Sequence, residues 1–233
     1  MGIGKFYEVI RDNFYWLHLY EDCKRVVASC VACQRLKQKP KHTPLRPTQK
    51  GSAPFQSWAV DYLPRLPESA EGFKHLLVII DTFSKWVELV PMRSKSSLEV
   101  ASVFKEYIFP RFGLPLEVRC DRGREFAGDF TKLCAEYKIK QITISTQHPE
   151  ANGLVERYVG IVKKSIMAML MTKGWDRTMW TECLGACVTG LRFAKVQSLG
   201  YSPFTICTGL EPRIPIAGTV IRDYAVDDGV DDE

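Results

Sequence analysis

The stretch that most constrains the fold is a short alternating segment that ends in an acidic turn and leads into a helical pattern. Residues 116–119 alternate apolar and charged side chains, as a half-buried strand does, and residues 126–137 carry apolar side chains at helical spacing. Asp121 lies between them, at the expected carboxyl end of the strand. Open α/β sheets place their chemistry in the crevice outside such strand ends, so Asp121 marks a candidate site.

Two further carboxylates can converge on this position. Glu156 lies at the start of a long helical pattern, and Asp61 lies near the end of an earlier strand over residues 55–63. Three acids from three elements can hold two hard divalent cations, which clamp the attacking and leaving oxygens of a phosphoryl displacement. Asp81 ends another apolar strand and is equally well placed, so the residues alone leave Asp61 and Asp81 as rivals for the first position.

The periodicity of the remaining core predicts an α/β domain with the element order β-β-β-α-β-α-β-α. A polar loop over residues 145–153 precedes Glu156 and is either a substrate-gating loop or a plain connector. The segment 175–194 is either one long helix or a helix pair. The expected strands are residues 55–63, 75–80, 85–91, 116–120 and 141–145, and the expected helices begin at Ser96 or Ser97, at Phe126 and at Leu154.

The bulk composition is that of a globular chain. Of 233 residues, 45% are hydrophobic and 25% are charged, which is enough apolar material for a real core. The longest apolar runs are far too short to span a bilayer, so we expect no membrane association. Eight cysteines are too few for a disulfide scaffold and indicate reduced thiols in an intracellular compartment.

The formal net charge of +5 is unevenly distributed. Residues 1–50 hold ten Lys and Arg against four Asp and Glu, whereas residues 216–233 form an acidic tail that we expect to be disordered. The basic half could neutralise phosphates of a nucleic acid, but a solvated charged face is an equally good interpretation of the charge alone.

Residues 1–37 predict a small helical module with half of a zinc site. Cys30 and Cys33 form a C-x-x-C pair, and structural zinc requires four ligands. His18 is single and lies too close to the cysteines, so it is interpreted as a surface or packing residue. Residues 38–54 combine prolines with basic side chains and predict an extended basic linker.

Four motifs, in this order and at these spacings, resemble a retroelement integrase, closest to those of gypsy-type LTR retrotransposons. The resemblance covers roughly residues 3–215. It implies a ribonuclease H-like core, a mixed five-stranded sheet flanked by helices, over residues 55–215. The motifs are Trp58-Ala59-Val60-Asp61, residues 78–86, Asp121-Arg122-Gly123-x-x-Phe126, and His148-Pro149-x-x-Asn152-Gly153-x-x-Glu156-Arg157.

The resemblance also implies a set of site residues. It selects Asp61 over Asp81 and makes Asp61, Asp121 and Glu156 an Asp-Asp-Glu triad that binds two Mg or Mn ions. It places two zinc-ligating histidines before Gly2, so we expect a truncated zinc module that binds Zn only if the missing ligands are supplied. The DNA-binding candidates are His148, Asn152, Arg157, Lys163 and Lys164, although a salt-bridged surface remains the alternative for the two lysines.

The function that the resemblance implies is metal-dependent DNA integration by a polynucleotidyl transferase. Its steps are 3′-end processing of retroelement DNA and strand transfer into target DNA, carried out by a homo-oligomer in the nucleus. One departure weakens this expectation, because Val159 and Gly160 replace the Asn and Arg that usually follow the glutamate. Two alternatives remain: a relic or co-opted fragment that only binds nucleic acid, and a general ribonuclease H-like nuclease.

Overall fold

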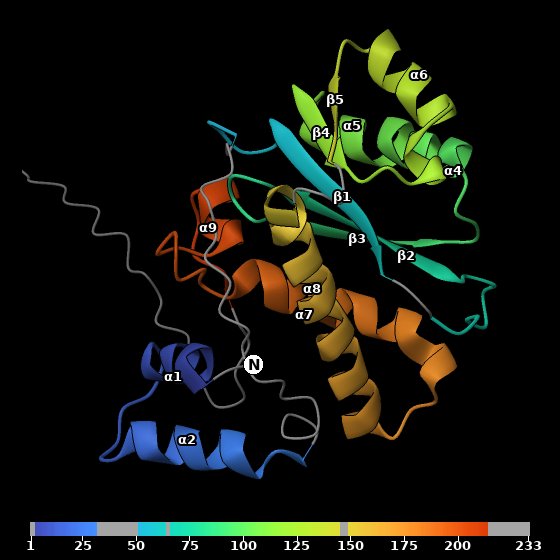
Figure 1. Ribbon diagram of the computed structural model, residues 1–233. Coiled ribbons are helices and arrows are strands. Elements are labelled where there is room, and N and C mark those ends of the chain that lie inside the picture. Colours follow the sequence, from blue (N-terminus) through green and yellow to red (C-terminus); the bar gives the residue numbers. More distant parts are fainter. Residues whose placement is uncertain (1–2, 32–50, 64–65, 145–148, 214–233) are drawn as a thin grey trace, which may run out of the picture.

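The core of the protein is one mixed five-stranded sheet with the strand order β3-β2-β1-β4-β5. The computed structural model describes residues 3–31, 51–63, 66–144 and 149–213, with the side chains of 149–152 excepted. β1 pairs antiparallel with β2 and parallel with β4, and β3 and β5 form the edges (Figure 1). The strands are β1 (Ser57–Leu63), β2 (His75–Asp81), β3 (Val87–Met92), β4 (Glu117–Cys120) and β5 (Lys140–Thr143). This arrangement confirms the ribonuclease H-like fold.

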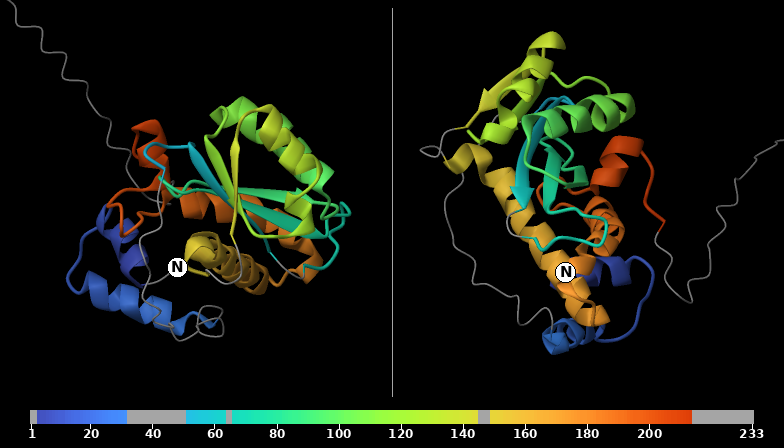
Figure 2. Two further views of the ribbon diagram at one scale, coloured as in Figure 1. Left: turned by 45° about the horizontal axis from the view of Figure 1, so that its top comes forward. Right: turned by 90° about the vertical axis from the view of Figure 1, so that its right-hand side faces the viewer.

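Helices cover both faces of the sheet (Figure 2). One layer consists of α4 (Ser97–Val103), η1 (Phe104–Ile108), α5 (Phe109–Phe112) and α6 (Asp129–Glu136), with the short η2 (Arg124–Phe126) before α6. The opposite layer consists of α7 (Pro149–Lys173), η3 (Arg177–Cys183) and α8 (Leu184–Phe193). α9 (Pro203–Thr208) follows α8. The predicted order of strands and helices is therefore confirmed.

Alternation along β1 separates two hydrophobic cores. Trp58, Val60 and Tyr62 face the layer of α4 and α6, where they pack with buried aromatic residues such as Phe104 and Phe130. Ala59 and Leu63 face the opposite layer, where they pack with Val155, Val162, Ile166 and Leu170 of α7. Because successive strand residues point to opposite faces, Asp61 belongs to the face that α7 covers.

Several helix boundaries differ from those expected. α7 begins at Pro149, so the prediction of a loop continuing to Gly153 is wrong, and Glu156 lies in the second turn of the helix. Proline lacks the backbone N–H that a first helical residue leaves unpaired, so it starts a helix without cost, and the apolar face that follows supports the weak formers Asn152 and Gly153. The segment 175–194 is a helix pair, with η3 leading directly into α8.

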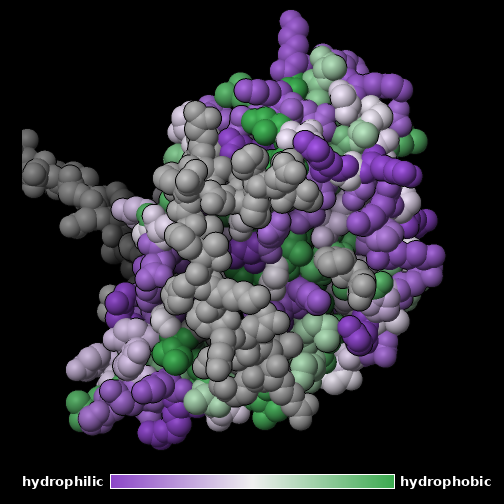
Figure 3. Space-filling view, viewed as in Figure 1, coloured by the Kyte–Doolittle hydropathy of each residue, from purple (hydrophilic) through white to green (hydrophobic). Residues whose placement is uncertain are grey.

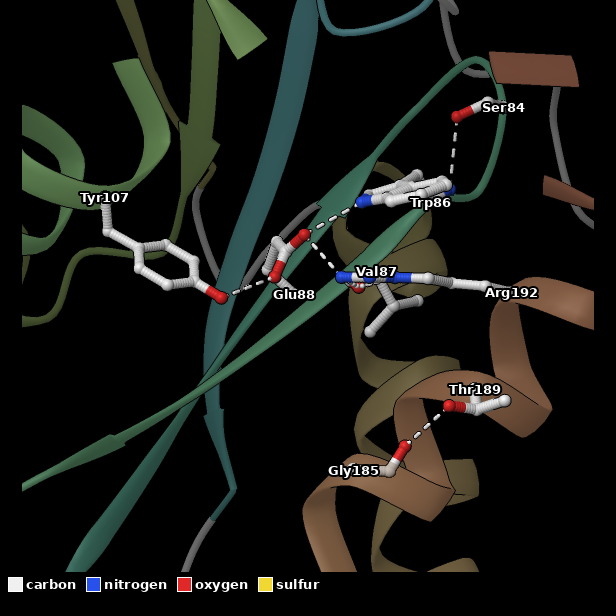
Figure 4. A network of polar contacts seen from close by, with 8 residues as sticks. All are labelled: Ser84, Trp86, Val87, Glu88, Tyr107, Gly185, Thr189 and Arg192. Carbon is white, nitrogen blue, oxygen red and sulfur yellow. Dashed lines mark hydrogen bonds and ion pairs between the residues drawn. The ribbon is translucent and has the colours of Figure 1, made fainter. Parts of the chain in front are cut away.

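A buried polar network fastens α8 to the edge strand β3 (Figure 4). The guanidinium of Arg192 donates to the backbone carbonyl of Val87 at 2.8 and 3.0 Å and to the carboxylate of Glu88, and it stacks 4.1 Å from the ring centroid of Trp86. Glu88 also accepts from the Trp86 indole at 2.8 Å and from the Tyr107 hydroxyl at 3.0 Å. The network thus joins both helix layers to one buried carboxylate.

The N-terminal module consists of α1 (Ile3–Arg11) and α2 (Leu19–Ser29), which lie at the lower left of Figure 1, away from the sheet. Lys195 contacts it through a 3.3 Å ion pair with Asp12. His18 is exposed, as a surface residue should be, and Cys30 directly follows α2. Cys33, most of the predicted linker and the acidic tail lie outside the described residues.

The visible face in Figure 3 is dominated by hydrophilic side chains, with small hydrophobic patches between them. Within the described part of the chain, no helix combines the length and the apolar character needed to cross a bilayer.

Candidate active site

The parallel register of β1 and β4 places two aspartates side by side. Ser57, Trp58 and Ala59 pair with Glu117, Val118 and Arg119, a constant offset that, continued by two residues, sets Asp61 opposite Asp121. Residues at the same register position of neighbouring strands point to the same face of the sheet. The structure therefore brings together two of the three predicted acids, which are sixty positions apart in the sequence.

Backbone amides orient both aspartates. One carboxylate oxygen of Asp121 accepts from the N–H of Gly123 at 2.8 Å, and one oxygen of Asp61 accepts from the N–H of Tyr62 at 2.7 Å. Both side chains are half-buried. These bonds fix the carboxylates at the strand ends, where the other oxygens are available to a ligand.

Glu156 approaches from α7, which packs across the face of β1 that carries Asp61. Its neighbour Val155 is fully buried in the core beneath the helix, whereas Glu156 itself is exposed. Burial, together with the negative charges of Asp121 and Glu156, raises the pKa of Asp61 to about 6. Asp121 and Glu156 are therefore both within electrostatic reach of Asp61.

The donor chemistry of this site suits a divalent cation. Carboxylate oxygens are the ligands that Mg and Mn prefer, and the mutual repulsion of three acids is relieved by a positive charge. Among the described residues, however, no three His, Cys, Asp or Glu side chains are grouped closely enough to form a complete metal site. The arrangement thus consists of two neighbouring aspartates, with the charge of Glu156 acting on Asp61.

Asp81, the rival for the first position, has a different role. Its side chain is fully buried and accepts from the backbone N–H of Ser84 at 2.7 Å, the Ser84 hydroxyl at 2.6 Å and the N–H of Phe55 at 3.1 Å. A carboxylate with all these partners holds the turn between β2 and β3 together. The geometry favours Asp61, as the resemblance implied.

Two site residues had not been anticipated from the sequence. Glu125 of η2 lies against Gly123, where an added Cβ would meet its carboxylate at 2.6 Å and an Asp121 oxygen at 2.9 Å. Lys95, from the loop before α4, lies 3.5 Å from Glu125. Glu125 could have been noticed because it stands within the Asp121-Arg122-Gly123 motif, but nothing in the sequence pairs Lys95 with this site.

The structure describes the side chains of three of the five DNA-binding candidates, all three on α7. Arg157, Lys163 and Lys164 are exposed along the helix. Asn152 lies in the first turn of α7, in the part whose side chains the structure does not describe, and His148 lies outside the described residues. Tyr158, which follows Arg157, is buried against the core.

Comparisons with known proteins identify two domains in the sequence. The family described as integrase core domain matches residues 51–149, and the integrase zinc binding domain matches residues 1–39. The Gag-Pol polyprotein of avian reticuloendotheliosis virus is 30% identical over 92% of this chain, and that of baboon endogenous virus is 31% identical over 82%. The chain spans 18% and 11% of these two polyproteins.

Solved structures give the same result. The catalytic core domain of HTLV-2 integrase, solved in complex with magnesium, is 25% identical with a TM-score of 0.53, covering 67% of this chain and 99% of that one. A simian T-cell lymphotropic virus intasome chain has a TM-score of 0.61 at 22% identity, covering 86% of this chain and 71% of its own, which supports the fold. The relatives named here are viral, so the gypsy-type assignment is not among these findings. The chain contains an integrase core domain and an integrase zinc-binding domain, and it is homologous to the integrase region of retroviral Gag-Pol polyproteins.

Proposed function

We propose that this chain carries out metal-dependent DNA integration, trimming the 3′ ends of retroelement DNA and joining them to target DNA. The observation that carries the proposal is the convergence of Asp61 and Asp121 through the β1–β4 register, with Glu156 close enough to raise the pKa of Asp61. The proposed reaction needs no protein nucleophile. The site is suited to attack by water or by a DNA 3′-hydroxyl.

The residues that would hold two Mg or Mn ions are Asp61, Asp121 and Glu156. When bound, such ions lower the pKa of the attacking hydroxyl and stabilise the leaving oxygen of the phosphodiester. The protein contributes orientation, since Gly123 and Tyr62 fix the two aspartates through their amides. Zinc would bind Cys30 and Cys33 only with two further ligands.

DNA is the proposed partner, both as retroelement end and as target. Exposed Arg157, Lys163 and Lys164 continue along α7 from Glu156 and provide cations for the phosphate backbone. We infer a homo-oligomer that acts in the nucleus of a host cell. The gypsy-type origin is likewise inferred, from the four motifs at residues 58–61, 78–86, 121–126 and 148–157.

A second candidate function is that of a catalytically impaired integrase that only binds nucleic acid. The observation that favours it is on α7, where Val159 and Gly160 replace polar and basic residues of the family pattern.

The deciding experiment incubates the purified chain with Mn and a branched oligonucleotide that mimics a joined element end, with Glu156→Gln in parallel. Release of the end with resealing of the target strand, by the parent and not the variant, is the expected result. If neither protein acts while both are folded and bind DNA, the second candidate is correct. Cleavage of an RNA–DNA hybrid without any joining would instead identify a general ribonuclease H-like nuclease.

A further inference from the structure

Lys95 places a positive charge beside the acidic site, from a loop that the proposed catalysis does not use. Its ammonium nitrogen lies 4.7 Å from the ring centroid of Tyr62 and 3.5 Å from a carboxylate oxygen of Glu125. Tyr62 follows Asp61 in β1, and Glu125 follows Asp121 by four residues. Lys95 therefore lies beside β1 and the turn after β4, on the face of the sheet to which Tyr62 points, and its charge reaches Asp61.

The positive charge of Lys95 acts electrostatically on Asp61. It lowers the pKa of Asp61, against the larger raising effect of burial. Among the described cations, Lys95 is thus one whose charge changes the pKa of a proposed catalytic carboxylate. Lys163 and Lys164 on α7 are not among the causes of that shift.

The loop that carries Lys95 is held in place by hydrogen bonds. Glu99 of α4 reaches back to accept from the backbone N–H groups of Arg93 and Ser94, each at 2.8 Å. The hydroxyl of Ser96 in turn accepts from the N–H of Glu99 at 3.2 Å and caps the helix. Because residues on both sides of Lys95 are fixed in this way, its side chain is aimed toward Tyr62.

The contacts of Lys95 are ones that an anion can replace. Its side chain is 42% exposed, and the distance to Glu125 is long for a charge-assisted hydrogen bond. A half-exposed pair of this kind contributes little stability. A phosphate that arrives at the aspartates finds an ammonium already positioned and only weakly engaged.

Glu125 is the carboxylate that pairs with the Lys95 ammonium in the absence of DNA. Its carboxylate is mostly buried, with 15% of the side chain exposed, and lies against Gly123 next to Asp121. It therefore cannot follow Lys95 outward. Binding of a phosphate by Lys95 exchanges one anionic partner for another.

We propose that Lys95 binds a backbone phosphate of the DNA strand that reaches Asp61 and Asp121, and that Glu125 holds the ammonium in position until DNA replaces it. Lys95 is thus a substrate-positioning residue. This inference rests on the proposed function, because it requires DNA to enter the acidic site.

The test measures how the DNA affinity of the full chain depends on salt. Binding of the branched oligonucleotide is measured at several salt concentrations and a fixed Mg concentration, in the Glu156→Gln background so that the DNA stays intact. Lys95→Gln is compared with Lys132→Gln, a matched control, because Lys132 on α6 is also an exposed lysine in a 3.3 Å ion pair, with Asp129.

The expected result is a smaller salt dependence for Lys95→Gln alone. Loss of one phosphate contact lowers the slope of log K against log salt by about 0.7–0.9, whereas Lys132→Gln keeps the parental slope. Lys95→Arg should restore the slope, and Glu125→Gln should raise the affinity about two- to fivefold, since it releases Lys95.

The outcomes separate the two proposals. If the parent binds DNA and Lys95→Gln has an unchanged slope, the role of Lys95 is wrong while the proposed function stands. If the parent does not bind the branched DNA at all, the proposed function itself fails. Thermal melting of each variant checks that the half-exposed substitutions leave the fold intact.

Discussion

Asp61 and Asp121 stand opposite each other in the continued register of two parallel strands, although sixty positions of sequence separate them. The pairing of Ser57–Ala59 with Glu117–Arg119 fixes this relationship before any ligand is present. The relative position of the two aspartates depends on the sheet and not on a loop. The pair proposed to bind metal is therefore pre-organised, and the third proposed ligand, Glu156, comes from a helix.

Replacing Asp61 by Asn should abolish metal-dependent strand transfer and disintegration while the chain remains folded. The substitution removes a charge from a half-buried position, and the amide nitrogen is not a metal ligand. The measurement is product formation with Mn on the branched oligonucleotide, together with a thermal melt.

Asp81→Asn is the matched control for Asp61→Asn and should keep its activity. It should cost about 1–3 kcal/mol of stability, because an amide cannot accept all the bonds from Ser84 and Phe55 that the carboxylate accepts. Urea unfolding and an assay below the melting temperature check both parts. Complete loss of activity in a folded Asp81→Asn protein would overturn the choice of Asp61.

The same carboxyl predicts a pH effect. Burial raises the pKa of Asp81 above its ordinary value of 3.8, against the lowering effect of its hydrogen bonds. A folded-state pKa above the unfolded value means that the folded protein holds this proton more tightly. The free energy of unfolding should therefore fall as the pH rises from 3.8 through the folded-state pKa, relative to Asp81→Asn. Paired urea titrations across this range measure the difference, and a difference that rises with pH would contradict it.

Added Mn should stabilise the parent protein through the acidic cluster. A ligand that binds only the folded state at a hundredfold excess over its Kd contributes about 2.7 kcal/mol. Differential scanning fluorimetry should show a melting temperature that rises with Mn in the parent and a much smaller rise in Asp121→Asn. An equal rise in both proteins would place the ion elsewhere.

Gly160→Ala should stabilise the chain by about 0.5–1 kcal/mol, since glycine in a helix interior is entropically costly and a Cβ there meets nothing within 4 Å. Gly174→Ala is the contrasting control. A Cβ there is equally free of contacts, but its φ of +66° strains an alanine, so stability should fall by about 1 kcal/mol. Chemical denaturation measures both, and stabilisation by both substitutions would refute the conformational argument.

Arg192→Ala should lower the free energy of unfolding by about 3 kcal/mol. The substitution leaves the buried Glu88 without its cationic partner, and it removes the hydrogen bonds that the guanidinium donates to the carbonyl of Val87. Lys195→Ala, which removes an exposed pair with Asp12, should cost less than about 1 kcal/mol. Hydrogen exchange should locate the Arg192→Ala effect in β3 and α8. If Arg192→Ala lowers the free energy of unfolding no more than Lys195→Ala does, the network around Glu88 contributes little to stability.

Local patterns were enough to predict the sheet and most helices. The strands β1, β2 and β3 alternate or are uniformly apolar and pair in sequence order, so periodicity identified them directly. The start of α7 was misplaced because Pro149, Asn152 and Gly153 are typical of a turn, whereas a long packed helix tolerates them in its first turns.

The sequence by itself determined which residue types could bind a metal and the order of elements that carry them. Only the tertiary structure distinguished the surroundings of Asp61 and Asp81, because strand register sets Asp61 opposite Asp121 whereas Asp81 is buried in a turn, and both end apolar strands in the sequence. It also decided that Lys95 and Glu125 meet at the site. Their contact depends on how α4 and η2 pack on the sheet, and no local pattern encodes a distance between residues thirty positions apart.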